Sequence, residues 1–270
     1  MWTFKDLLKN FFTHKDFLPS SDKIPGTMFT PLHFVFSLIS IALVIALALL
    51  LAKKSEKTIK TVFTVLWALI VVLEITKIVW ETCSGKTVSF EWGGILPLYP
   101  CSIFMYAMPL VIWGNDFLRR AGCGYLCTLG FLGGTINFVY PATILGNYSC
   151  ISFAGFHTFL YHGAIVFAAI VVLKSGYHSF RGVTKWWQLL VPSIPFFAVS
   201  IVANAVNFSK IGSDYMFFKL NSFIFAPIGA ATPDALAVVI VYFAYLLIHA
   251  SCYIPSYIAN LKAARKARDK

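Results

Sequence analysis

The sequence predicts an all-α, polytopic membrane protein with about seven transmembrane helices. Composition is the first reason: of 270 residues, 59% are hydrophobic and only 12% are charged, whereas soluble domains are nearer half apolar and a quarter charged. The second reason is that the apolar residues form runs of roughly 20 residues with short connections, which leaves no room for a soluble domain of ordinary size. Disordered, coiled-coil, collagen-like and small disulfide-rich proteins are therefore excluded.

The apolar runs follow one another along the chain between charged residues. The first continues without a charge to Leu51 and stops at Lys53 and Lys54. The third contains Pro97 and Pro100 near its start. The fourth contains closely spaced glycines that favour tight helix packing. The predicted spans are 30–52, 61–80, 95–114, 122–140, 151–173, 186–206 and 233–257. They form one bundle over residues 30–257, between an amino-terminal segment at 1–29 and a basic tail at 258–270.

Membrane topology explains the positive charge of the chain. Lysine and arginine number 22 against 11 acidic residues, a net charge of +11. The positive-inside rule places the carboxy terminus in the cytoplasm and, after seven crossings, the amino terminus outside. No nucleic-acid partner is needed to account for the charge. Of the 22 basic residues, 14 fall on the predicted cytoplasmic side: Lys53, Lys54, Lys57, Lys60, Arg119, Arg120, Lys174, Arg181, Lys185, Lys262, Arg265, Lys266, Arg268 and Lys270.

The amino-terminal segment is too charged to span a membrane, yet it has an apolar pattern of its own. Phe4, Leu7, Leu8, Phe11 and Phe12 recur at helical spacing, with lysines between and after them. This pattern predicts an amphipathic helix in the membrane interface. The alternative is a helix that only caps the mouth of the bundle.

Ionisable side chains inside a bilayer are costly and usually face a cavity or one another, so they indicate functional sites. Here most of them fall in the outer halves of the predicted spans, which suggests one polar pocket that opens outward. Glu74 and Lys77 also have a simpler interpretation. Their opposite charges stand at i and i+3 of one helix, where the two side chains neutralise each other. His33 and His249 are favoured as hydrogen-bonding contacts between helices. The outer layer comprises His33, Glu74, Lys77, Cys101, His157, His162, Asn204 and Asp234.

Cys101 differs from the other cysteines in its setting. Pro97 and Pro100 precede it, and because proline has no N–H, the backbone there is irregular. Irregular backbone at membrane depth is tolerated where it lines a cavity or is buried in protein. A cysteine in such a place, with a histidine to take its proton, is the minimal nucleophile and base pair of acyl-transfer chemistry.

Two histidines of the fifth predicted span are candidates for that base. His157 matches Cys101 in predicted depth, whereas His162 lies about 7 Å deeper. Their five-residue separation puts the two rings roughly 140° apart around the helix. Both rings therefore cannot point squarely into one pocket, and the residues alone leave the choice open.

The remaining cysteines are interpreted as structural, since cysteine packs as a small apolar residue. Cys83 and Cys150 fall in predicted outer connections and could pair in an oxidising compartment. Cys123 and Cys127 stand at i and i+4, but no further ligand has zinc-like spacing, so no metal site and no cofactor are expected. A retinal protein is excluded because residues 235–261 contain no lysine.

The run Leu96-Pro97-Leu98 followed by Cys101 resembles the bacterial YwaF-like integral membrane proteins, which are grouped with the animal transmembrane protein 164 acyltransferase. The resemblance covers most of the chain through elements that match in order and spacing. These are Thr30-Pro31-Leu32-His33, Glu74, the run ending at Cys101, Pro141, Phe156-His157, Tyr161-His162-Gly163, Asn204 and Asp214-Tyr215-Met216.

For the animal member, the resemblance implies a cysteine acyl-enzyme with a histidine partner that moves a fatty acyl chain from a phospholipid to a lysophospholipid. Carried over to this chain, the nucleophile is Cys101 and the base is His162, whose His-Gly context fits the family pattern. Tyr99 and Asp214 depart from the family, which commonly has His and Asn there. Tyr215 and the backbone near Pro100 are candidate oxyanion donors. The expected substrate-binding residues are His33, Glu74, Tyr99, His157, Asn204, Asp214 and Tyr215.

The leading hypothesis is a membrane-embedded lipid acyltransferase or transacylase with a cysteine thioester intermediate. Its expected partners are phospholipid, lysophospholipid and the bilayer, in the plasma membrane of a bacterium or an endomembrane of a eukaryote. The alternative is a binding or transport protein, with or without proton coupling, whose Glu74, Asp234 and histidines bind a small solute or lipid. A third interpretation, an interaction subunit without chemistry, predicts a closed apolar core around Cys101.

Overall fold

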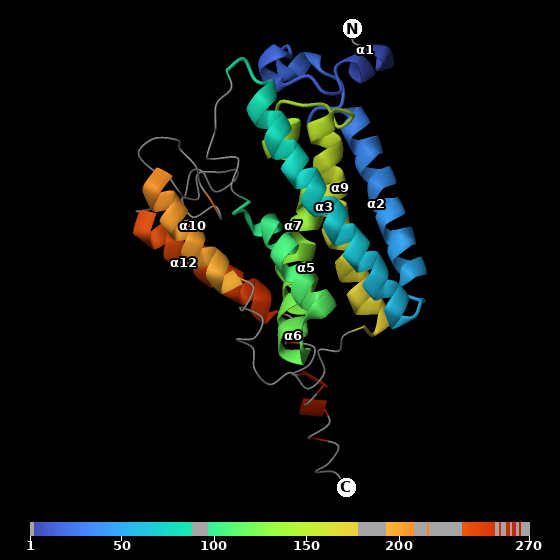
Figure 1. Ribbon diagram of the computed structural model, residues 1–270, viewed down its shortest axis with the longest axis vertical. Helices are drawn as coiled ribbons and strands as arrows, with labels where there is room; N and C mark the ends of the chain where they lie inside the picture. Colours follow the sequence, from blue (N-terminus) through green and yellow to red (C-terminus); the bar gives the residue numbers. More distant parts are fainter. Residues whose placement is uncertain are drawn as a thin grey trace. The chain divides into compact units, whose positions relative to one another are not determined.

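The computed structural model describes residues 3–87, 97–177, 193–207, 215 and 234–251, with single positions between 254 and 265. Every regular element in these ranges is helical (Figure 1), which agrees with the predicted all-α class. The chain forms two compact units, each described here by itself. The first comprises Met1–Glu91 with Phe131–Val171, and the second comprises Trp92–Gly130 with Val172–Lys270.

Two long apolar helices, α2 (Pro31–Leu51) and α3 (Glu56–Ser84), form one side of the first unit. Thr30 caps α2, because its hydroxyl accepts the His33 N–H at 3.4 Å. Ser55 caps α3 in the same way. Few apolar side chains of either helix are buried, as expected of helices that face lipid.

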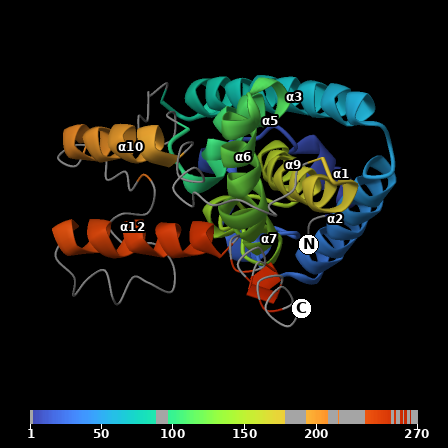
Figure 2. The ribbon, with the colours of Figure 1, turned by 90° about the horizontal axis from the view of Figure 1, so that it is seen from below.

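Helices α7 (Phe131–Val139) and α9 (Phe153–Ser175) complete this unit, with the short α8 (Ala142–Leu145) between them. Figure 2 shows α9 running alongside both α2 and α3. Gly134 lets α7 approach α9 closely, since an added Cβ would lie 2.8 Å from Cγ2 of Val166. The apolar core is therefore built mainly from α2, α7 and α9.

The amino-terminal segment caps one end of the first unit (Figure 1). Its helix α1 covers only Phe4–Lys9, shorter than the periodicity predicts. Beyond α1, groups on α3 and α9 donate hydrogen bonds to backbone carbonyl oxygens of this segment. Nε1 of Trp80 donates to the Phe12 carbonyl oxygen at 3.0 Å, and the backbone N–H of Phe153 donates to the Phe11 carbonyl oxygen at 2.8 Å. Two 3-10 turns, η1 (Lys15–Phe17) and η2 (Ser21–Lys23), follow.

The amino-terminal segment has features that bear on both alternatives that the sequence left open. It is tied to the ends of α3 and α9, yet Phe4, Leu8 and Phe12 remain exposed while Leu7 is buried. Exposed aromatic and aliphatic side chains beside lysines suit a membrane interface. The interfacial location of this segment stays a prediction.

In the second unit, the first described element is η3 (Pro100–Ser102), a 3-10 turn that leads directly into α5 (Ile103–Trp113). Asn115 then caps α6 by accepting the Leu118 N–H at 3.0 Å. Gly122 of α6 lies against α5, where an added Cβ would be 2.8 Å from the Ala107 carbonyl oxygen. The elements are η3 (Pro100–Ser102), α5 (Ile103–Trp113), α6 (Asp116–Tyr125) and the π-helical turn η4 (Leu126–Gly130).

Helices α10 (Ser193–Asn207) and α12 (Asp234–Ala250) also belong to the second unit. Phe197 of α10 packs edge-on against Tyr242 and Tyr245 of α12, with ring centroids 5.2 and 5.4 Å apart. α12 also contacts η4.

Each of the seven predicted spans contains a helix, and the helices establish a multi-pass integral membrane protein. Four described stretches are long and apolar enough to cross a bilayer: Pro31–Leu51, Glu56–Ser84, Asp116–Leu145 and Phe153–Ser175. Pro100–Trp113 and Leu236–Ile248 are shorter apolar helices. The number of crossings and the sides on which the termini lie stay predictions.

Candidate functional site

Cys101 is the middle residue of η3, which opens the apolar helix Pro100–Trp113. Tyr99 precedes this turn in an extended conformation, and no side chain caps it. Pro100 fits the first position of a helix, where its missing N–H breaks no intrahelical bond. The side chain of Cys101 is a partly exposed thiol. The irregular backbone expected near the prolines is therefore a single 3-10 turn at Cys101.

Tyr125, the last residue of α6, is bound to the backbone of this turn. Its Oη lies 2.9 Å from the carbonyl oxygen of Pro100 and 3.3 Å from that of Cys101. The side chain of Tyr125 is fully buried. A phenol has one proton, so the shorter contact is the main hydrogen bond and the second carbonyl shares it. Sequence patterns do not indicate Tyr125, because its partners lie on another helix.

Two further contacts hold the chain just before Cys101. The rings of Tyr99 and Tyr215 lie 5.6 Å apart, and Tyr215 is fully buried. The buried hydroxyl of Ser200 donates to the Leu98 carbonyl oxygen at 3.5 Å, the outer limit for such a bond. The structure thus brings Tyr99, Cys101 and Tyr215 together within the second unit.

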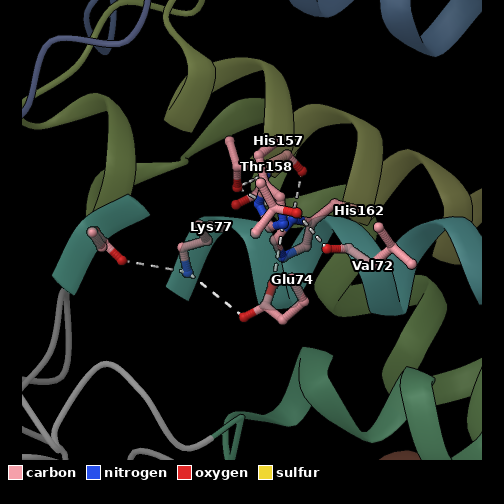
Figure 3. Close-up of polar contacts among 9 residues, drawn as sticks. Val72, Glu74, Lys77, His157, Thr158 and His162 are labelled. Carbon is pink, nitrogen blue, oxygen red and sulfur yellow. Dashed lines mark hydrogen bonds and ion pairs between the residues drawn. The ribbon is translucent and has the colours of Figure 1, made fainter. Parts of the chain in front are cut away.

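A charged cluster joins α3 to α9 in the first unit (Figure 3). Oε2 of Glu74 lies 3.1 Å from Nε2 of His157, and Nζ of Lys77 lies 3.7 Å from Glu74 and 3.9 Å from Glu81. The pairing of Glu74 with Lys77 confirms the i, i+3 prediction. The side chains of Glu74 and His157 are only 12% and 6% exposed. Because burying charges is costly unless they are paired, these contacts explain how the cluster is tolerated.

His162 lies one and a half turns further along α9 and is held differently. Its Nδ1 is 2.8 Å from the carbonyl oxygen of Thr158 and 3.3 Å from the Thr158 hydroxyl. A carbonyl oxygen only accepts, so Nδ1 carries the proton of the neutral ring and Nε2 keeps its lone pair. Thr158 was not predicted from the sequence, although its position four residues before His162 is the signal that would have found it.

The two histidines therefore have separate environments, as their angular separation suggested. Nε2 of His157 faces the Glu74 carboxylate, whereas Nδ1 of His162 is bound to its own helix. The ring of Tyr161 is near both, with its centroid 5.8 Å from that of His157 and 5.6 Å from that of His162. Of the two, His162 has the tautomer that leaves a basic Nε2.

The other predicted site residues are distributed as follows. His33 is completely buried at the start of α2, where its Nδ1 accepts the Phe29 N–H at 3.2 Å. This contact belongs to the amino-terminal end of α2 and supports the interpretation of His33 as a structural residue. The side chains of Asn204, Asp214, Asp234 and His249 lie outside the described residues.

Cys83 and Cys150 are separate thiols. Cys83 is exposed near the end of α3, whereas Cys150 is buried beside Gly26, with its amide 2.8 Å from the Gly26 carbonyl oxygen. Gly26 has φ of +83°, a conformation that favours glycine. Burial raises the pKa of the Cys150 thiol to about 11.

The predicted site residues thus form two groups, one in each unit. Glu74, His157 and His162 gather between α3 and α9, and Tyr99, Cys101 and Tyr215 gather around η3. Together with the long apolar helices, they define a helical multi-pass membrane protein that carries buried ionisable groups at membrane depth.

Comparison with known proteins identifies the family. The sequence model of the TMEM164 family matches residues 28–257, so the chain belongs to this family, and the resemblance to transmembrane protein 164 is confirmed. No curated protein and no solved structure matches the chain.

Proposed function

We propose that this protein is a membrane-embedded lipid acyltransferase or transacylase in which Cys101 is the nucleophile and His162 the general base. The observation that carries the proposal is the position of Cys101 in the first turn of the helix Pro100–Trp113. The amino-terminal end of a helix stabilises nearby negative charge, which favours the reactive thiolate. Membership of the TMEM164 family supports the same chemistry.

The proposed reaction has two balanced steps. First, Nε2 of His162 takes the thiol proton, and the thiolate of Cys101 attacks the ester carbonyl of a phospholipid. The ester C–O bond breaks, the acyl chain stays on sulfur, and the departing lysophospholipid oxygen takes the proton from His162. Second, His162 removes a proton from the hydroxyl of an acceptor lysophospholipid, whose oxygen attacks the thioester and releases the thiolate. His162 then returns the proton to Cys101.

The environment of His162 suits this role. Its Nδ1 proton is bound by the Thr158 carbonyl, which leaves Nε2 as the proton acceptor. Phospholipid and lysophospholipid are the proposed substrates, and the bilayer that supplies them is the proposed location.

Intact-mass measurement after incubation with a defined phospholipid tests the proposal. The wild type is expected to gain one acyl chain, and Cys101→Ala to gain none. His162→Ala should slow adduct formation by about 10² to 10⁴-fold, as expected on loss of a general base. The matched control is His14→Ala, which removes an imidazole in the amino-terminal segment and should retain acylation. Full acyl transfer by both Cys101→Ser and His162→Ala would refute the mechanism.

A second candidate function is the binding or transport of a small polar or amphiphilic solute. The observation that favours it is the buried Glu74 and His157 pair, because intramembrane ionisable pairs often mark solute or proton pathways. This function predicts solute-dependent thermal stabilisation that Glu74→Gln abolishes and Cys101→Ala leaves intact. The acyltransferase proposal predicts that Cys101→Ala abolishes turnover, so the two variants separate the candidates.

A further inference from the structure

The turn that carries Cys101 has little local support. It is a three-residue 3-10 turn, a geometry with poorer hydrogen bonds than an α-helix. No side chain caps it, and Pro100 contributes no N–H. Besides the bond from the Ser102 N–H to the Tyr99 carbonyl oxygen at 2.8 Å, groups elsewhere in the second unit hold this turn.

Tyr125 provides such a group. Its buried hydroxyl contacts the carbonyl oxygens of both Pro100 and Cys101, at 2.9 and 3.3 Å. The first carbonyl belongs to the peptide bond between Pro100 and Cys101, and the second to the peptide bond between Cys101 and Ser102. A single donor shared between them restrains the backbone on both sides of the Cys101 Cα, and so the direction of the Cα–Cβ bond that carries the sulfur.

The π-helical turn η4 begins directly after Tyr125. η4 contacts both η3 and α12, so the end of α6 is anchored against the turn of Cys101. Single π-turns inside α-helices are frequent at functional sites, where the extra residue changes the direction of the side chains around it. The π-turn gives a structural reason for the orientation of Tyr125 toward η3.

We propose that Tyr125 is a positioning residue for the Cys101 nucleophile, acting through the carbonyls of Pro100 and Cys101. The inference rests on the proposed acyl transfer. Attack on an ester needs the sulfur and the carbonyl carbon in a near-attack geometry, and misplacement by about 1 Å costs on the order of 10²-fold in rate. Loss of the hydrogen bond therefore affects the acylation step rather than the binding of the lipid.

Tyr125→Phe tests this inference, because it removes the hydroxyl and keeps the ring. The matched control is Tyr148→Phe in the first unit, where an equally buried phenol oxygen accepts the Lys15 N–H at 3.2 Å. Single-turnover acylation of Cys101 by phospholipid is expected to slow by about 10- to 100-fold in Tyr125→Phe, with KM unchanged. Tyr148→Phe is expected to acylate at the wild-type rate.

A second measurement separates positioning from a general loss of structure. Iodoacetamide is small and diffuses freely, so its reaction with Cys101, followed by peptide mapping, does not require an aligned lipid ester. We expect this alkylation rate to change little in Tyr125→Phe while acylation falls. Replacement of Tyr125 by 4-aminophenylalanine, which keeps a donor at the same place, is expected to restore acylation.

The outcomes distinguish the inference from the function on which it rests. Equal acylation by wild type and Tyr125→Phe overturns the positioning role and leaves the acyltransferase proposal standing. A parallel fall in acylation, alkylation and thermal stability also overturns it, since the residue would then be structural only. If Tyr125→Phe fails to fold, acylation by the 4-aminophenylalanine protein at a reduced rate overturns it. Absence of any acyl adduct on the wild type overturns both proposals.

Discussion

Nδ1 of His162 lies 2.8 Å from the carbonyl oxygen of Thr158, one turn earlier in the same helix. The bond fixes the ring tautomer through the backbone of α9, so no side chain from another element is needed to orient the ring. An orienting group of this kind usually comes from a carboxylate, as in serine hydrolases. Here the helix itself provides the acceptor.

Substitution of Thr158 tests this backbone origin. Thr158→Val removes the hydroxyl but keeps the carbonyl, so acyl transfer is expected to stay close to that of the wild type. His162→Asn keeps an N–H donor near the carbonyl but removes the base, and should lower transfer by about 10² to 10⁴-fold. Initial rates of labelled acyl transfer check both. A loss in Thr158→Val as large as that in His162→Asn would show that the hydroxyl, and not the carbonyl, orients the ring.

Gly134 and Gly133 form a matched pair for the packing of α7 on α9. A Cβ at Gly134 would lie 2.8 Å from Val166 Cγ2 and 3.1 Å from the His162 carbonyl oxygen, whereas a Cβ at Gly133 meets nothing within 4 Å. We expect Gly134→Ala to destabilise the protein by about 1 to 3 kcal/mol through overpacking. Gly133→Ala should be neutral or stabilise by up to about 1 kcal/mol, because alanine favours a helix. Thermal unfolding in detergent measures both, and equal Tm values would contradict the close approach.

Glu74 and His157 are expected to be energetically coupled. Each side chain is largely buried, and the two atoms that face each other are 3.1 Å apart. A double-mutant cycle with Glu74→Gln and His157→Gln should give an interaction energy of about 0.5 to 3 kcal/mol. The exposed Lys86, which lies 6.0 Å from the Phe17 ring, provides a control because Lys86→Gln should be additive with Glu74→Gln. If the effects of Glu74→Gln and His157→Gln on stability were additive as well, the two side chains would not be energetically coupled.

The thiols of Cys83 and Cys150 should differ in reactivity. Burial raises the pKa of Cys150 to about 11 from 9.0, so its thiolate fraction at pH 8 is only about one in a thousand. Cys83 is exposed. Peptide mapping after brief maleimide treatment at pH 8 should find Cys83 labelled and Cys150 unlabelled until the protein is denatured.

The same shift has a consequence for stability. Because the folded-state pKa of Cys150 is the higher one, its contribution to stability is complete below pH 9 and is lost as the pH rises to about 11. Cys150→Ala should flatten that part of the stability profile. An unchanged slope between pH 9 and 11 in Cys150→Ala would mean that other groups control it.

The positions of the helices could be predicted because hydropathy is a local property. A run of roughly 20 apolar residues predicts a spanning helix wherever it occurs. Each of the seven predicted spans contains a helix, and four described stretches are long and apolar enough to cross a bilayer. The amino-terminal helix was predicted too long for a related reason. Periodicity continues through Phe11 and Phe12, but their carbonyls are bound by the Phe153 amide and the Trp80 indole, contacts that a local pattern does not contain.

The all-helical membrane class, the family resemblance and the i, i+3 pairing of Glu74 with Lys77 could all be predicted from the amino-acid order. Tertiary structure decided which groups these residues meet. His157 lies 83 positions after Glu74, and Tyr125 lies 25 positions after Pro100. Contacts between such distant positions depend on how helices pack and rotate against each other, and hydropathy does not encode that rotation. The pairing of Glu74 with His157 and the hydrogen bond that holds the Cys101 turn are therefore properties of the folded protein alone.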